Sequence, residues 1–136
     1  MPMLPDDDPA LVVRTDYRDE AGWTAVRDTV VEPSEEGFEA LVQFVEDPGL
    51  ADLSVDELLA LVPPDSPHTF LLVVDRVALT TPGNPLLVVD LLHSRGASFR
   101  ALPGEVQGIE NNLSISNLDF EDFAGAVGAD GVFRGF

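Results

Sequence analysis

The hydrophobic pattern of this chain contains one apolar pentapeptide twice. Leu-Leu-Val-Val-Asp fills residues 71–75 and recurs at residues 86–90. A short apolar run of this kind is typical of a strand that is buried on both faces of a sheet. The residues between the copies are at the lower limit for a parallel crossover, and they include the turn-forming sequence Thr-Thr-Pro-Gly-Asn-Pro. We therefore expect residues 76–79 to extend the first strand and the two copies to pair as an antiparallel hairpin.

The register of this hairpin determines where its two terminal aspartates lie. We place the centre of the turn between Pro82 and Gly83. Asp75 then lies directly opposite Asp90, with Cβ atoms about 4.5–5.5 Å apart, where like charges repel each other. The next turn is expected to return a third strand that brings Arg100 opposite Asp90 and offsets this repulsion. In the structural interpretation, this polar row fixes the register or marks strand ends that reach water.

The alternative interpretation of the same residues is a site for a divalent cation. Asp75 and Asp90 form a carboxylate pair that can hold Mg²⁺ or Ca²⁺, or act as acid and base in a small metal-assisted enzyme. Asp16 ends a predicted strand and is a third candidate ligand, because ligands bind at the carboxyl edge of parallel sheets. An antiparallel hairpin argues against a site of three aspartates, since neighbouring strands then end at opposite edges.

Predicted strands and helices follow each other along the rest of the chain, after an acidic tail at residues 1–9 that we expect to be flexible. Asp19 is a good N-cap for one helix, and Ser54 with Glu57 forms a capping box for another. Beyond the pentapeptides, strands are predicted at residues 10–16, 38–47 and 98–102, and helices at residues 19–32, 53–64, 103–112 and 117–128. For residues 10–136 we expect one α/β domain, with α+β as the alternative: a mixed sheet with an antiparallel meander at about 69–102 and helices packed on both faces.

Charge is the strongest compositional signal. The 136 residues carry 25 acidic and seven basic side chains, which gives a net charge of −18. Nucleic acids and anionic membranes would be repelled by such a chain, whereas a basic protein partner would be attracted to it. The absence of cysteine excludes disulfides and thiol catalysis. Together with the lack of a signal-peptide pattern, it predicts a cytoplasmic protein.

The densest polar segment lies near the C-terminus. It contains five amide and hydroxyl side chains within seven residues: Asn111, Asn112, Ser114, Ser116 and Asn117. These groups either satisfy backbone groups between two helices or form a recognition loop for a partner. No nucleophile elbow and no phosphate-binding loop occurs in the sequence, so we expect no enzymatic activity and no cofactor.

Several long stretches resemble a known family. The segments LVVRTDYRDEAGW, LSVDELLALVP, PLLVVDLL, FRALP and especially IENNLSISNLDFEDFAGAVGADGVFRGF are similar to a family of small acidic actinobacterial proteins that is known only as a domain of unknown function. The resemblance covers about residues 10–136 and implies no activity, cofactor or catalytic residue. The short D-F-E-D-F stretch also resembles the last helix of small immunity proteins that neutralise toxins.

These observations predict a non-enzymatic cytoplasmic interaction protein, in the manner of an immunity protein, whose acidic surface binds a basic partner. The alternative is the metal-binding protein or metal-assisted enzyme that uses Asp75 and Asp90. A third possibility is a structural accessory to another protein.

Overall fold

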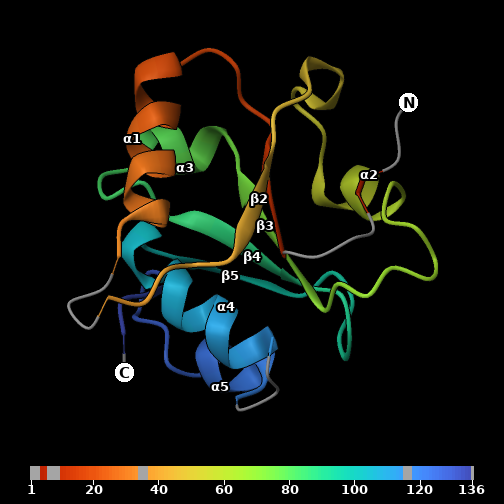
Figure 1. Ribbon diagram of the computed structural model, residues 1–136, viewed down its shortest axis with the longest axis vertical. Coiled ribbons are helices and arrows are strands. Elements are labelled where there is room, and N and C mark those ends of the chain that lie inside the picture. The colour runs from red at the N-terminus through yellow and green to blue at the C-terminus, as the bar shows by residue number, and fades with distance from the viewer. Residues whose placement is uncertain (1–3, 6–9, 34–36, 115–117, 136) are drawn as a thin grey trace.

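A six-stranded mixed sheet in the order β2-β1-β3-β4-β5-β6 organises the computed structural model, which describes residues 4–5, 10–33, 37–114 and 118–135 (Figure 1). The strands are β1 (Ala10–Arg14), β2 (Val42–Val45), β3 (Phe70–Val74), β4 (Leu86–Asp90), β5 (Ser98–Ala101) and β6 (Val132–Phe133). The helices are α1 (Glu20–Val31), α2 (Val55–Leu59), α3 (Arg76–Thr80), α4 (Val106–Ser114) and α5 (Phe120–Ala124), with 3₁₀ turns η1 (Pro48–Leu50) and η2 (Pro103–Glu105).

The strand directions confirm the predicted mixed sheet. Strands β1, β2 and β3 are parallel, β4 runs antiparallel to both β3 and β5, and β6 is parallel to β5. The antiparallel meander is therefore β3-β4-β5, as predicted. Because only β4 runs the other way, the carboxyl ends of the other five strands gather at one edge of the sheet.

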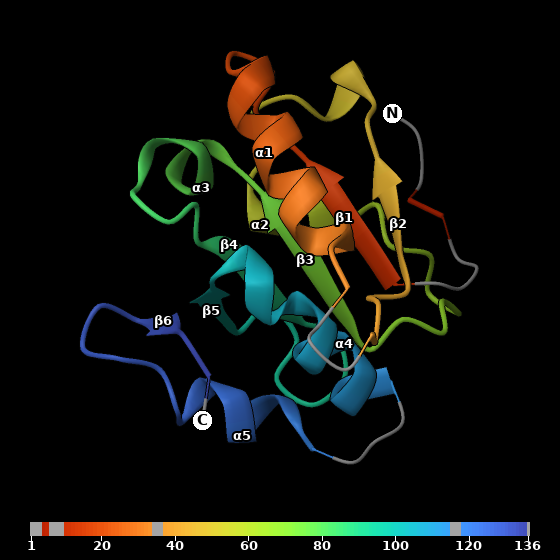
Figure 2. The same ribbon diagram turned by 60° about the vertical axis from the view of Figure 1, so that its left-hand side comes forward.

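Both faces of the sheet are covered, because the strands are apolar on both sides. Val12 and Leu72 point to the face that packs against Trp23 of α1 and the aromatic residues of α5. Leu11 and Leu71, one position earlier in each strand, point to the opposite face, which α2 and η1 cover. Figure 2 shows α1 and α4 in front of the sheet and α2 behind it. The prediction of helices on both faces is confirmed.

The predicted register of the hairpin is wrong. Asp90 pairs with Phe70 and not with Asp75, so the two aspartates lie at opposite ends of the strand pair. Residues 76–79 do not extend the strand; they form α3, because Asp75 acts as its N-cap and its Oδ1 accepts a hydrogen bond from the Ala78 amide at 3.0 Å. The prediction overlooked that a strand-ending aspartate is also a strong helix start.

The remaining elements differ from the prediction mainly in length. The capping box at Ser54 and Glu57 is present, but α2 has one turn only. Within the segment 38–47, which was predicted as a strand, β2 covers the four residues Val42–Val45. At the C-terminal end, Val132 and Phe133 are buried in β6, so the chain packs onto the sheet there. None of the helices among the described residues has the length and apolar character needed to cross a membrane.

Candidate functional site

The carboxyl ends of β1 and β3 carry a network of polar side chains. The chain leaves β1 toward β2 on one side and returns to β3 on the other, so this is the point at which the strand order reverses. Open α/β sheets bind ligands at such points. An open hollow of about 220 Å³ lies here, and we call it the β1/β3 crevice. It is lined by Thr15, Arg18, Asp52, Leu53, Asp75, Arg76 and Val77.

Arginines hold the carboxylates of the crevice. The Arg18 guanidinium donates to Asp16 Oδ1 at 3.1 Å and to Asp52 Oδ1 at 3.0 Å. Arg100 binds Asp75 with both terminal nitrogens, at 2.9 and 2.8 Å. Such charge-assisted pairs already neutralise these oxygens, so they are poor ligands for a metal ion.

The ionisation of Asp16 depends on this arrangement. Burial raises the pKa of the Asp16 carboxyl. Hydrogen bonds from the Arg18 side chain and backbone, together with the charges of Arg18 and Arg76, outweigh this effect and bring the pKa below its usual 3.8. Because the Asp16 pKa is lower in the folded than in the unfolded protein, the ionised carboxylate stabilises the fold at pH values above the unfolded-state pKa. This contribution is lost as the pH falls through the folded-state pKa.

We therefore expect the NMR titration midpoint of the Asp16 carboxyl to lie below 3.8 and to rise in Arg18→Gln. The stability difference between wild type and Arg18→Gln should be largest above pH 3.8 and shrink as the solution is acidified below it. Arg27→Gln, an exposed arginine that pairs with Glu46, is the control and should leave the Asp16 midpoint in place. An Asp16 midpoint that Arg18→Gln does not move would contradict this account.

The structure separates Asp90 from the other two predicted metal ligands. Asp16 and Asp75 follow β1 and β3 at the same edge, as parallel strands require. Asp90 lies at the other end of β4, 1% exposed, and its two oxygens accept hydrogen bonds from the amides of Leu92 and Ser94 at 2.9 and 2.7 Å. Within the described ranges, no group of three or more His, Cys, Asp or Glu side chains could hold a metal ion. Asp75 and Asp90 thus do not form the expected carboxylate pair.

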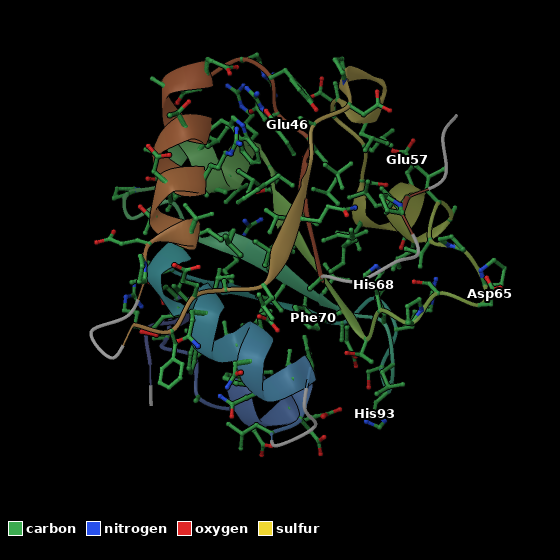
Figure 3. All side chains as sticks on the ribbon, in the orientation of Figure 1. Glu46, Glu57, Asp65, His68, Phe70 and His93 are labelled. Atoms are coloured by element: carbon green, nitrogen blue, oxygen red, sulfur yellow. The ribbon has the colours of Figure 1, made fainter. Side chains whose placement is uncertain are left out.

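The two ends of the sheet can be followed in Figure 3. Glu46, which directly follows β2, lies at the upper end, whereas Phe70 and His93 lie at the lower end. Phe70 is the residue that pairs with Asp90. Arg100 lies opposite Leu87 of β4 and not opposite Asp90, as the predicted register required. Its long side chain nevertheless reaches the Asp75 carboxylate.

The polar segment 111–117, interpreted above either as groups that satisfy the backbone or as a recognition loop, is helical over its first part. Asn111 and Asn112 belong to α4, and the Asn112 amide donates to the Gly108 carbonyl at 2.7 Å. Ser114 is the last residue of this helix, while Ser116 and Asn117 lie outside the described residues. The residues that follow Ile109 therefore continue helix α4 as far as Ser114. In the following D-F-E-D-F stretch both phenylalanines, Phe120 and Phe123, are buried in the core.

A buried arginine is the main feature that the sequence did not predict. The Arg14 side chain is 3% exposed and pairs with Glu20 at 2.8 Å. Its Nε donates to the Asp16 carbonyl, and its guanidinium lies 4.3 Å from the Tyr17 ring centroid and 5.1 Å from that of Trp23. The only signal in the sequence is a lone charge at the end of the apolar run Ala-Leu-Val-Val.

A second exposed region lies in the connection from α1 to the edge strand β2. Val31, Phe38 and Leu41 are 45%, 62% and 68% exposed. Exposed carboxylates accompany them in the same stretch of chain. We call this region the α1–β2 surface; it consists of Asp28, Val31, Glu32, Phe38, Glu39 and Leu41.

A buried glutamate of α4 binds the backbone at one end of the α1–β2 surface. Oε1 of Glu110, on α4, accepts a hydrogen bond from the Leu41 amide at 2.7 Å. The Glu110 side chain is buried, so this contact ties the start of β2 to the helical layer. In Figure 1, residues 37–41 lead to the lower end of β2, the strand at the outer edge of the sheet.

Comparison with known families gives one match. A family model described as "Domain of unknown function (DUF6924)" matches residues 9–136, nearly the whole chain. A comparison with curated proteins finds no match. The family match confirms the resemblance to a domain of unknown function and brings no assigned activity with it.

Proposed function

We propose, for a chain that belongs to the DUF6924 family of unknown function, that it is a non-enzymatic interaction module whose acidic surface binds a basic protein partner. The observation that carries this proposal is how the chain uses its arginines. Arg14, Arg18, Arg27, Arg100 and Arg134 each form an ion pair with a carboxylate of the same chain. The net charge of −18 is therefore a surplus of carboxylates that this chain has no basic groups to neutralise.

Surface charge by itself speeds the association of a partner but contributes little binding energy. Rim charges mainly raise the association rate and suppress wrong partners. Most of the binding energy at protein interfaces comes from a few large apolar or aromatic side chains that a ring of polar groups surrounds. The proposed contact must therefore contain exposed apolar residues beside carboxylates.

The α1–β2 surface has this composition. Phe38 and Leu41 supply exposed apolar area, and the exposed residues Glu32 and Glu39 supply negative charge in the same stretch of chain. The surface also borders β2, whose outer edge has no neighbouring strand in the described sheet. A basic protein with an apolar centre among arginines or lysines is the complement of this surface.

The test begins with the full chain immobilised in native lysate at low and at high salt. A basic protein that is retained at low salt and released at high salt is identified by mass spectrometry and then purified. We expect Phe38→Ser combined with Leu41→Ser to weaken its binding about tenfold or more, because hot-spot truncations cost about 2 kcal/mol or more. Calorimetry or biolayer interferometry with the purified partner measures this change.

The matched control is Val77→Ser. Val77 is another exposed apolar residue, 47% exposed, but it lies on α3 at the carboxyl edge of the sheet. It should leave partner affinity within about twofold, because it is outside the contact. If no salt-sensitive basic partner is retained, or if both variants bind like the wild type, the proposal fails.

A further inference from the structure

The β1/β3 crevice contains one guanidinium that is unlike the others around it. Within the part of the chain that the structure describes, the Arg76 side chain forms neither a hydrogen bond nor an ion pair, and the residue is exposed. Its neighbours Arg18 and Arg100 are both occupied by aspartates. Arg76 is therefore the cation of the crevice that is available to a ligand.

The local charge of the crevice differs from that of the whole chain. Three carboxylates and three guanidinium groups line it or pair with the groups that line it: Asp16, Asp52, Asp75, Arg18, Arg76 and Arg100. Their formal charges sum to zero on a chain whose net charge is −18. Charges farther away than about 8 Å are largely screened at physiological ionic strength. The groups that line the crevice or pair with its lining are thus balanced in charge, and they do not add to the repulsion of an anion.

The shape of the crevice limits the size of the ligand. Its volume of about 220 Å³ is below the roughly 300–1,000 Å³ of drug-sized sites, so it suits a small molecule. Leu53 and Val77 provide apolar wall beside the charged groups. The position at the strand-order reversal of the sheet is the general location of ligand sites in open α/β folds.

We infer that the β1/β3 crevice binds a small oxyanion, a carboxylate or a phosphate group, with the Arg76 guanidinium as its anchor. Guanidinium groups recognise the paired oxygens of carboxylates and phosphates through parallel hydrogen bonds. The aspartates of the crevice keep Arg18 and Arg100 in place, so the ligand adds to a preformed ion-pair network and does not replace it. This site is separate from the α1–β2 surface and does not depend on the proposed partner.

The experiment is a titration of the full chain followed by ¹H–¹⁵N NMR, with inorganic phosphate in one series and acetate in another, at constant ionic strength. We expect saturable shifts in the millimolar range at the amides of Thr15, Leu53 and Arg76. In Arg76→Gln the affinity should fall about tenfold or more, because a charge-assisted contact is lost. Saturation by phosphate alone identifies a phosphate-bearing ligand, and saturation by acetate alone identifies a carboxylate.

The control variant is Arg95→Gln, which removes the same charge from the exposed loop after β4 at the opposite end of the sheet. It should keep the affinity within about twofold of the wild type. Equal weakening in both variants would show that only net charge matters. That result, shifts away from the crevice, or no saturation by either anion would overturn the inference. Binding of the basic partner by Arg76→Gln provides an independent readout, so failure here leaves the proposed function testable.

Discussion

Replacing Arg14 by alanine should lower the free energy of unfolding by about 3 kcal/mol, because the side chain is buried and its removal empties a packed position beside Trp23. Three groups depend on it: Glu20 at 2.8 Å, Glu46 at 3.7 Å and the Asp16 carbonyl at 3.0 Å. The substitution also removes the cation that lies against the Trp23 ring and leaves a cavity there. The carboxylate partners add little to this loss, since the Glu20 and Glu46 side chains are 74% and 36% exposed and can be hydrated.

Arg27→Ala is the matched control for this prediction. Arg27 also pairs with Glu46, at 3.5 Å, and also lies over an aromatic ring, that of Phe44. Its side chain is exposed, however, and exposed ion pairs contribute about 0–1 kcal/mol. Chemical denaturation of the two variants compares a buried with an exposed arginine on the same carboxylate. An equal effect of both substitutions would show that burial of Arg14 does not matter.

Replacing Asp90 by alanine should lower the free energy of unfolding by about 2 kcal/mol. Both carboxylate oxygens accept backbone hydrogen bonds, from Leu92 and Ser94, and these define the loop between β4 and β5. The variant leaves both amides without their acceptor and empties a position that is 1% exposed. Asp90→Asn keeps the volume and one acceptor, so it should cost about half as much. Denaturant unfolding of both variants measures the difference.

The same variants separate the structural from the metal-binding interpretation of Asp90. If the role is structural, the destabilisation should be the same with and without millimolar Mg²⁺ or Ca²⁺. A cation ligand would instead give the wild type a cation-dependent rise in melting temperature that Asp90→Ala removes. Asp75→Ala serves as the companion variant, because Asp75 caps α3 and pairs with Arg100 at the other end of the hairpin. A cation effect lost in both variants would contradict the separation of these residues in the structure.

The twin pentapeptides show how far local patterns reach. Both copies are buried strands, and they pair antiparallel, as the apolar runs and the turn sequence predict. Their register was not predictable from the same signals, because the aspartate that ends the first copy starts a helix. One turn of helix shifted the pairing by five residues and moved two charges to opposite ends of the sheet. Local propensity favours both a longer strand and a helix after Asp75. In the folded chain the helix forms, and the strand ends at Val74.

The candidate sites divide in the same way. The charge surplus, the absence of cysteine and the helix caps at Asp19 and Ser54 are properties of the sequence, because they depend on composition or on residues within one turn of each other. Strand order, the crevice between β1 and β3, the burial of Arg14 and the exposure of Phe38 depend on contacts between residues far apart in the chain. Such contacts form only where two apolar faces meet in space, and no local pattern records which faces those are.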